Sequence, residues 1–199
     1  MDLSNFNYKK YWEDNYKGNG NSGLGSYGSL ADFKSSIVNK IIEEYQVKST
    51  IEFGCGDGNQ IRTINYGNYI GFDVSPTSVE MCGNIFKSDS NKKFLAYDPL
   101  TFNSSEYSAD MVVCLDVLYH ITIEEDFVAT LNSIFNTARK VVVLYTKLTT
   151  SYAEYPDLGT IVDRDIYSYL KKYESFKVVD TIHQNLGSSA SFLIMEKVI

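Results

Sequence analysis

Residues 51–59 read Ile51-Glu52-Phe53-Gly54-Cys55-Gly56-Asp57-Gly58-Asn59. A β-prone run over residues 49–53 breaks here into glycines at every second position, which predicts a strand, a tight turn and a helix from about Asn59. Because glycine has no Cβ, a ligand can approach the backbone of such a turn closely. Exposed N–H groups at the start of a helix favour anionic or polar groups. The stretch therefore predicts a ligand-binding turn.

This loop has three possible interpretations: two different nucleotide-binding patterns and an ordinary glycine-rich turn. A dinucleotide fold requires G-x-G-x-x-G, which would need glycine at position 59, where Asn59 stands. The pattern present is acid-x-Gly-x-Gly-x-Gly, with Glu52 ahead of the glycines. That pattern resembles the first motif of class I methyltransferases that depend on S-adenosylmethionine (AdoMet).

Composition limits the classes of protein. The 199 residues are 44% hydrophobic and 22% charged, which suits one globular domain over residues 1–199. A net charge of −7 with scattered Lys and Arg disfavours nucleic acid as a partner. The N-terminus lacks signal-peptide features and no apolar run reaches about 18 residues, so we expect a cytoplasmic protein without a membrane span. Three cysteines without C-x-x-C spacing and two distant histidines predict no disulfide framework and no metal site.

The N-terminal region combines an aromatic helix with a glycine-rich segment. Residues 8–17 predict a short helix that contains Trp12, the only tryptophan. Residues 18–29 are mostly Gly, Asn and Ser, which indicates either a linker or a lid over a binding site, and we favour the lid. Ser29, with Asp32 three residues later, resembles a capping box for a helix whose apolar stripe extends to Tyr45.

The rest of the chain alternates between strand and helix patterns. Strands are expected over residues 69–74, 93–97, 111–115 and 141–145, and helices from Ser75-Pro76, over 127–138 and over 162–173. Residues 177–182 and 191–198 predict a terminal antiparallel β-pair. Continuous apolar strands that alternate with helices indicate an α/β fold, a mostly parallel sheet covered on both faces.

Three strand ends carry the broader resemblance: the glycine turn, Asp73 and Asp98. Asp73 lies 19 residues after Gly54, close to the spacing of about 20 at which an acid reaches a ribose hydroxyl. In this order they resemble the class I methyltransferase fold, a doubly wound, Rossmann-like seven-stranded sheet. The resemblance implies AdoMet as cofactor, with the glycine loop beneath its methionine part, Asp73 on the ribose hydroxyls and Asp98 facing the adenine amino group.

A narrower resemblance involves residues 11–13, 21–28, 51–60 and 115–120. They are similar to a bacterial subgroup whose members are often encoded with glycosyltransferases and capsule or surface-polysaccharide genes. The resemblance implies that residues 22–27 fold over bound AdoMet and that Asp116 and His120 face the transferable methyl group. The cofactor-binding residues expected from it are Trp12, Ser22, Gly23, Gly25, Ser26, Tyr27, Glu52, Phe53, Gly54, Gly56, Asp73, Val74, Asp98, Leu115 and Asp116.

These features favour an O-methyltransferase that acts on a small polar acceptor, such as a sugar or another capsule precursor. His120 has a suitable pKa for a general base near neutrality, and Asp116 either orients it or holds the acceptor hydroxyl. The alternative for His120 is a structural histidine hydrogen-bonded to backbone.

Other functions and states stay open at this point. One alternative is a non-catalytic AdoMet-binding module that regulates a partner enzyme. A nicotinamide-dependent reductase is disfavoured by Asn59. The Asn/Asp-Pro-Pro-Tyr/Phe motif of amino-methylating nucleic acid enzymes is missing after the fourth strand, and no Mg²⁺-binding set of acids can be assembled around Asp116. A monomer and a homodimer fit the sequence equally.

Overall fold

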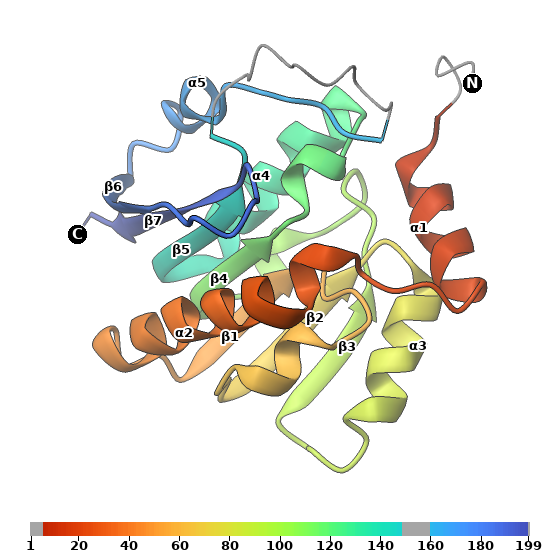
Figure 1. Ribbon diagram of the computed structural model, residues 1–199. Helices are drawn as coiled ribbons and strands as arrows, with labels where there is room; N and C mark the ends of the chain where they lie inside the picture. The colour runs from red at the N-terminus through yellow and green to blue at the C-terminus, as the bar shows by residue number, and fades with distance from the viewer. Residues whose placement is uncertain (1–5, 149–159, 199) are drawn as a thin grey trace.

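The computed structural model describes residues 6–148 and 160–198, so residues 1–5, on which the expectation about the N-terminus rests in part, lie outside it. Its centre is a seven-stranded sheet of order β3-β2-β1-β4-β5-β7-β6 (Figure 1). The strands are β1 (Ser49–Phe53), β2 (Asn68–Asp73), β3 (Lys92–Ala96), β4 (Ala109–Leu115), β5 (Ala138–Thr146), β6 (Phe176–Ile182) and β7 (Ser191–Lys197). All pairs are parallel except those of β7, which runs antiparallel to both β5 and β6. The predicted mostly parallel sheet with an antiparallel terminal pair is confirmed.

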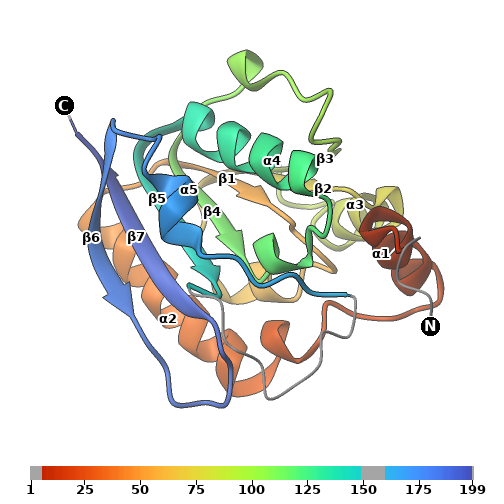
Figure 2. The ribbon, with the colours of Figure 1, turned by 90° about the horizontal axis from the view of Figure 1, so that it is seen from above.

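Helices cover both faces of the sheet, as a doubly wound fold requires. They are α1 (Tyr8–Lys17), α2 (Gly28–Glu44), α3 (Pro76–Ile85), α4 (Glu124–Thr137) and α5 (Ile166–Leu170), with short 3₁₀ turns η2 (Leu24–Ser26), η3 (Gln60–Thr63), η4 (Ser104–Glu106) and η5 (Leu118–His120). Seen from above, α2 lies on one side of the strands and α4 with α5 on the other (Figure 2). Two apolar clusters fill the spaces between these layers.

Local chemistry explains where the best-predicted elements begin. Ser75 caps α3 because its hydroxyl accepts a hydrogen bond from the Ser78 N–H at 3.1 Å, and Pro76 occupies the first turn, where no amide partner is needed. Every residue of β4 is buried, which its continuous apolar run requires because helices cover both faces.

Two predicted helical features are wrong. After Asn59 the chain forms only the 3₁₀ turn η3, because the Gln60 amide bonds back to α2 and Ile61 and Ile64 turn into the core before β2 begins. Ser29 does not cap α2: the helix begins at Gly28, and the N-cap residue Tyr27 makes no side-chain cap bond. Its hydroxyl bonds to Asp57 instead.

The helix expected over residues 162–173 is confined to α5, which covers only its middle. The residues before it form a strap across η5, since the Val162 N–H donates to the Tyr119 carbonyl at 2.8 Å. Buried Arg164 donates to the Ile121 carbonyl at 3.0 Å and to Glu124 at 2.9 Å. These long-range bonds hold the strap in an extended conformation.

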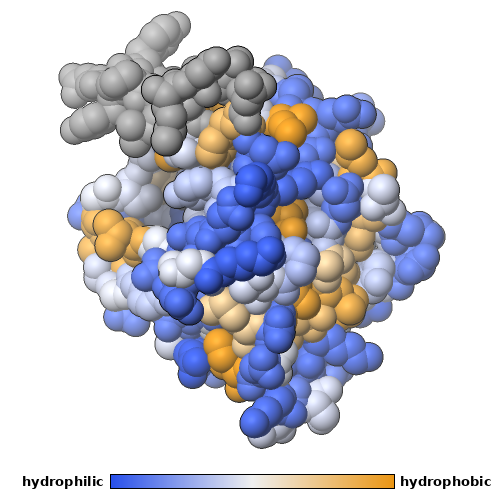
Figure 3. All heavy atoms as spheres, turned by 90° about the vertical axis from the view of Figure 1, so that its right-hand side faces the viewer, coloured by the Kyte–Doolittle hydropathy of each residue, from blue (hydrophilic) through white to orange (hydrophobic). Residues whose placement is uncertain are grey.

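The surface over the side of the molecule that carries α1 and α3 is mostly hydrophilic, with apolar patches that are small and separate (Figure 3). Single apolar residues scattered in this way are usual for a protein surface. Within the described part of the chain, none of the helices has the length and apolar character needed to cross a membrane.

Candidate active site

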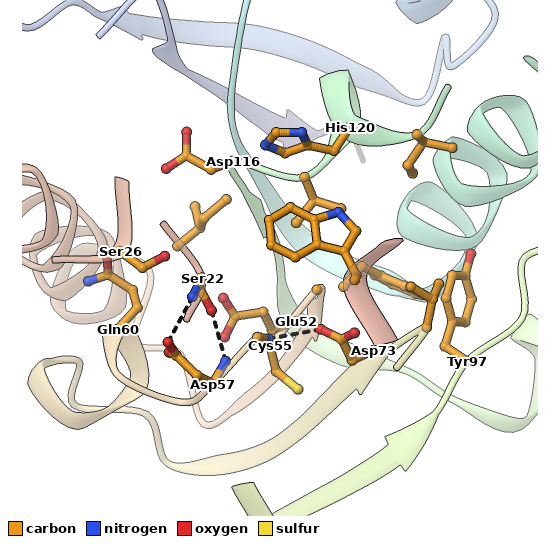
Figure 4. Close-up of a pocket in the computed structure, with 18 of the residues that line it drawn as sticks. Ser22, Ser26, Glu52, Cys55, Asp57, Gln60, Asp73, Tyr97, Asp116 and His120 are labelled. Carbon is orange, nitrogen blue, oxygen red and sulfur yellow. Dashed lines mark hydrogen bonds between the residues drawn. The ribbon is translucent and has the colours of Figure 1, made fainter. Parts of the chain in front are cut away.

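A cavity opens near the carboxyl ends of β1, β2 and β4, where the strand order reverses between β1 and β4. It contains about 840 Å³ of space that no atom fills, its open mouth included. In doubly wound sheets ligand sites lie at this reversal point. The predicted residues that line the cavity are Trp12, Ser22, Ser26, Glu52, Phe53, Gly54, Gly56, Asp73, Val74, Leu115, Asp116 and His120 (Figure 4).

The glycine loop leaves β1 through two residues that only glycine can occupy. Gly54 has φ +89°, and a Cβ there would lie 2.2 Å from Val117 Cγ2. Gly56 has φ +57°, and its Cβ would lie 2.3 Å from Ser22 Oγ. The Gly54 N–H donates to the Phe72 carbonyl at 2.7 Å, which ties the loop to β2. Residues 54–56 are therefore held in one conformation and present backbone rather than side chains, and we call them the cradle.

Asp73 ends β2 beneath this loop and is only 6% exposed. Its Oδ2 accepts the Gly56 N–H and its Oδ1 accepts the Ser75 N–H, both at 2.9 Å. Burial raises the pKa of its carboxyl, although both hydrogen bonds oppose that shift. Each oxygen keeps a lone pair, so the side chain can still accept two ligand hydroxyls.

The segment predicted as a lid is joined to the glycine loop through Asp57. Its Oδ2 accepts the Ser22 N–H and the Tyr27 hydroxyl, each at 2.8 Å, while the Asp57 N–H donates to Ser22 Oγ at 2.9 Å. Gly25 approaches the site so closely that a Cβ there would lie 2.6 Å from Asp116 Oδ2. Gly23, Gly25 and Tyr27 are not among the residues that line the cavity, so their contacts with the cofactor stay predictions.

This attachment predicts the behaviour of the segment. Asp57→Ala should expose residues 18–29 to chymotrypsin, which cleaves after Leu24 and Tyr27, about tenfold faster than in the wild type, because charge-assisted bonds are lost. S-adenosylhomocysteine should slow cleavage of the wild type. The rates can be followed by mass spectrometry, with Asp180→Ala, exposed on β6, as control. Equal cleavage with and without the ligand would contradict a lid.

Asp116 follows β4 in the left-handed region, with φ +61°, which is uncommon for a residue other than glycine. Tyr119 donates its hydroxyl to Oδ1 at 2.7 Å, and Lys34 donates Nζ to Oδ2 at 2.6 Å. Lys34 is completely buried. The carboxylate is therefore held by two partners from different elements at the mouth of the cavity.

His120 is hydrogen-bonded to backbone, the contact that the sequence offered as the alternative to a bond with Asp116. The Asp116 carboxylate accepts hydrogen bonds from Lys34 and Tyr119, and His120 Nδ1 lies 3.1 Å from the Thr160 carbonyl oxygen. A carbonyl oxygen can only accept, so Nδ1 carries the proton and Nε2 has the free lone pair. Burial lowers the pKa of His120, so the ring is neutral near pH 7. Trp12 contacts it edge-on, with ring centroids 5.2 Å apart.

Asp98 lies outside the cavity lining. Lys9 of α1 is ion-paired with it at 2.8 Å, and the Leu100 N–H donates to its other oxygen at 3.0 Å. The Lys9 ammonium beside it is the main reason that the pKa of Asp98 is lowered. Its proposed contact with an adenine amino group stays a prediction.

Solved structures of methyltransferases share the fold of this chain. N-methyltransferase NodS from Bradyrhizobium japonicum WM9, in complex with S-adenosyl-L-homocysteine, superposes with a TM-score of 0.76 at 13% identity, over 96% of this chain and 99% of its own. Magnesium protoporphyrin IX methyltransferase ChlM from Synechocystis PCC 6803, with bound SAH, gives 0.70 at 16% identity, over 95% and 97%. The CurJ carbon methyltransferase gives 0.64 at 18% identity, over 87% of this chain and 57% of its own. At these identities the likeness establishes the fold.

The sequence itself carries a further match, since residues 51–141 fit the family model described as a methyltransferase domain. That range includes the glycine loop, Asp73 and Asp116. Residues 51–141 are therefore a methyltransferase domain, and AdoMet is the cofactor of this enzyme. No curated protein matches its sequence.

The methyltransferase site also contains residues that sequence reasoning missed. Lys34 interrupts the apolar stripe of α2 between Phe33 and Ile37, and a lysine on a buried helix face was the signal that could have revealed it. Asp57, an acid inside the glycine loop, was a similar signal that this loop bonds to the segment predicted as a lid. The Thr160 carbonyl had none, because a backbone group leaves no mark in a sequence.

Glu52 gives the methyltransferase a testable pH dependence of stability. It is 3% exposed and accepts the Tyr69 hydroxyl at 2.6 Å, and burial raises its pKa to about 7. An unfolded chain releases this proton near pH 4.3. Between about pH 4.3 and 7 the folded state therefore binds more protons than the unfolded state, so its contribution to stability falls as pH rises and stays constant above 7.

Glu52→Gln should remove this loss. We expect the variant to match the wild type at pH 4.5 and to exceed its free energy of unfolding at pH 8 by about 3 kcal/mol at most. Urea unfolding at both pH values measures the difference, with exposed Glu44→Gln as control. A difference of the same size at both pH values would refute this role for the carboxyl.

Proposed function

We propose that this methyltransferase methylates a hydroxyl group of a small polar acceptor, such as a sugar or another precursor of capsule or surface polysaccharide. The observation that carries the proposal is the neutral His120, whose Nδ1 is committed to the Thr160 carbonyl and whose Nε2 is free to accept a proton. A hydroxyl acceptor must lose a proton during methylation, whereas an amine that arrives neutral can do so later.

The residues of the cradle fit AdoMet. Asp73 retains two acceptor positions for the ribose hydroxyls. Gly54 and Gly56 line the cavity with backbone alone, because a Cβ on either would meet Val117 or Ser22. Val74 and Tyr97 line the cavity beside Asp73 and suit the adenine ring. When bound, AdoMet supplies an electrophilic methyl group on a sulfonium.

The protein's own groups would then align the acceptor and receive its proton. His120 Nε2 accepts the hydroxyl proton, and Asp116 accepts a second hydroxyl of the acceptor, since its carboxylate is fixed by Lys34 and Tyr119. Trp12 and Val117 line the same cavity and exclude water from the reacting atoms. A polyhydroxyl compound such as a sugar offers both groups at once.

A panel of free sugars and sugar nucleotides tests the proposal. Incubation with AdoMet should release S-adenosylhomocysteine, measured by mass spectrometry, only in the presence of a hydroxyl acceptor that becomes methylated. Product formation from amines alone would argue for a different acceptor atom. Binding of AdoMet without turnover on any member would favour a regulatory AdoMet-binding module.

A further inference from the structure

The charges around the cavity are unbalanced. Carboxylates of Glu52, Asp57, Asp73 and Asp116 line it, and Lys34 is the only permanent cation among the lining residues that the structure describes. Lys34 Nζ is fully buried, 2.6 Å from Asp116 Oδ2 and 5.4 Å from the centre of the Tyr145 ring. An ammonium has three N–H donors, and Asp116 uses one. A buried ammonium with donors to spare suits an anionic group in the cavity.

Gln60 has an unused acceptor in the same region. The side chain is 6% exposed, and its Nε2 donates to the Ala31 carbonyl at 3.0 Å and to Ser35 Oγ at 2.8 Å. Because the Ala31 carbonyl can only accept, these bonds fix which end of the amide is nitrogen. Gln60 Oε1 is buried and has no hydrogen-bond partner among the described residues. Such an atom needs a donor, which a ligand can supply.

The two side chains share one end of the cavity. Gln60 packs against Ser35, the neighbour of Lys34 on α2. In the close-up, Gln60 and Ser26 lie on one side and Asp73 and Tyr97 on the other, with Glu52 between them (Figure 4). An adenosine group held at Asp73 therefore leaves the remainder of the cofactor to extend toward Gln60 and Lys34.

We propose that Lys34 and Gln60 bind the α-amino-acid end of AdoMet. Lys34 Nζ donates to the α-carboxylate, and Gln60 Oε1 accepts from the α-ammonium group. This assignment rests on the placement of the cofactor under the proposed function, with adenosine at Asp73. In this assignment the α-carboxylate is paired with Lys34 and the α-ammonium group with Gln60. Lys34 then contacts both the cofactor and Asp116.

Calorimetry with two ligands tests the proposal without any acceptor. S-adenosylhomocysteine contains the amino-acid end, whereas 5′-methylthioadenosine keeps the adenosine and the thioether but lacks it. Lys34→Met and Gln60→Met should each weaken S-adenosylhomocysteine binding roughly tenfold and change methylthioadenosine binding less than about twofold. Lys40→Met, exposed on the same helix, is the control. Equal losses for both ligands, or no loss for S-adenosylhomocysteine, would overturn the assignment.

Lys34→Met leaves Asp116 without its cation, and this variant could fail to fold for that reason. Gln60→Met then tests the proposal on its own. Gln60→Met keeps the shape of the side chain, and an S-adenosylhomocysteine analogue with hydrogen in place of the amino group completes the comparison. Wild type and Gln60→Met should bind this analogue equally, because the analogue has no ammonium group for Gln60 Oε1 to accept from. The bonds to Ala31 and Ser35, which the variant also loses, lie within the protein. A tenfold difference that persists with the analogue would contradict the proposal. These affinities do not depend on which acceptor the enzyme methylates. The proposal for the amino-acid end of AdoMet and the proposal of a hydroxyl acceptor can therefore fail independently.

Discussion

His120→Ala should lower kcat by about 10²–10⁴, the usual contribution of a general base, while the affinity for S-adenosylhomocysteine stays within about twofold. The reason is the arrangement of the ring: the Thr160 carbonyl fixes the proton on Nδ1 at 3.1 Å, and Nε2 is left as the base. Steady-state kinetics and calorimetry separate the two quantities. His183→Ala is the matched control, because this exposed histidine bonds to Ser191 away from the cavity.

The pH profile gives an independent readout of the same residue. The base must be unprotonated, and burial lowers the pKa of His120 below its ordinary value near 6.5. Wild-type activity should therefore rise through one ionisation below that value and stay level above it, and the profile of His120→Ala should be flat. Asp116→Asn should lose less activity than His120→Ala, because the amide still offers an acceptor oxygen. Turnover that survives in His120→Ala with an unchanged profile would reduce His120 to a structural residue.

Asp73→Ala should weaken binding of S-adenosylhomocysteine about 100-fold. Two ribose hydroxyls would lose a charged acceptor, and the Gly56 N–H would lose the partner that fixes the cradle at 2.9 Å. Calorimetry measures the affinity, and thermal unfolding shows whether the variant is folded.

Asp180→Ala controls for the loss of an acid, since this residue is exposed on β6. Methylthioadenosine should lose affinity for Asp73→Ala as well, because it keeps the ribose. A wild-type dissociation constant in Asp73→Ala would refute the assignment of the ribose site.

The features that the sequence predicts well depend on neighbouring residues. The glycine spacing after β1 and the acid after β2 obey local rules: a turn with positive φ needs glycine, and parallel strands bring their carboxyl ends to one edge. Ser75-Pro76 predicts the start of α3 in the same way. These rules were sufficient for the sheet, the cradle and Asp73.

The features that the sequence does not predict depend on contacts between distant segments. Lys34 and Asp116 are 82 residues apart, and Ser22, in the segment predicted as a lid, is 35 residues from Asp57. No local pattern specifies such a pair, because the fold must first bring the two segments together. The helix expected from Asn59 fails for a related reason: the Gln60 amide is used in a contact with α2 rather than in a helix of its own.

Transfer of the methyl group to oxygen can be tested by following the group itself. The enzyme is incubated with AdoMet carrying a CD₃ group and with a matched pair of acceptors, a sugar nucleotide and its amino-sugar counterpart. Fragmentation in the mass spectrometer then locates the label. We expect CD₃ on a hydroxyl oxygen of the sugar in both acceptors, and we expect this label to be lost in His120→Ala. Label on the amino nitrogen or on carbon would contradict it.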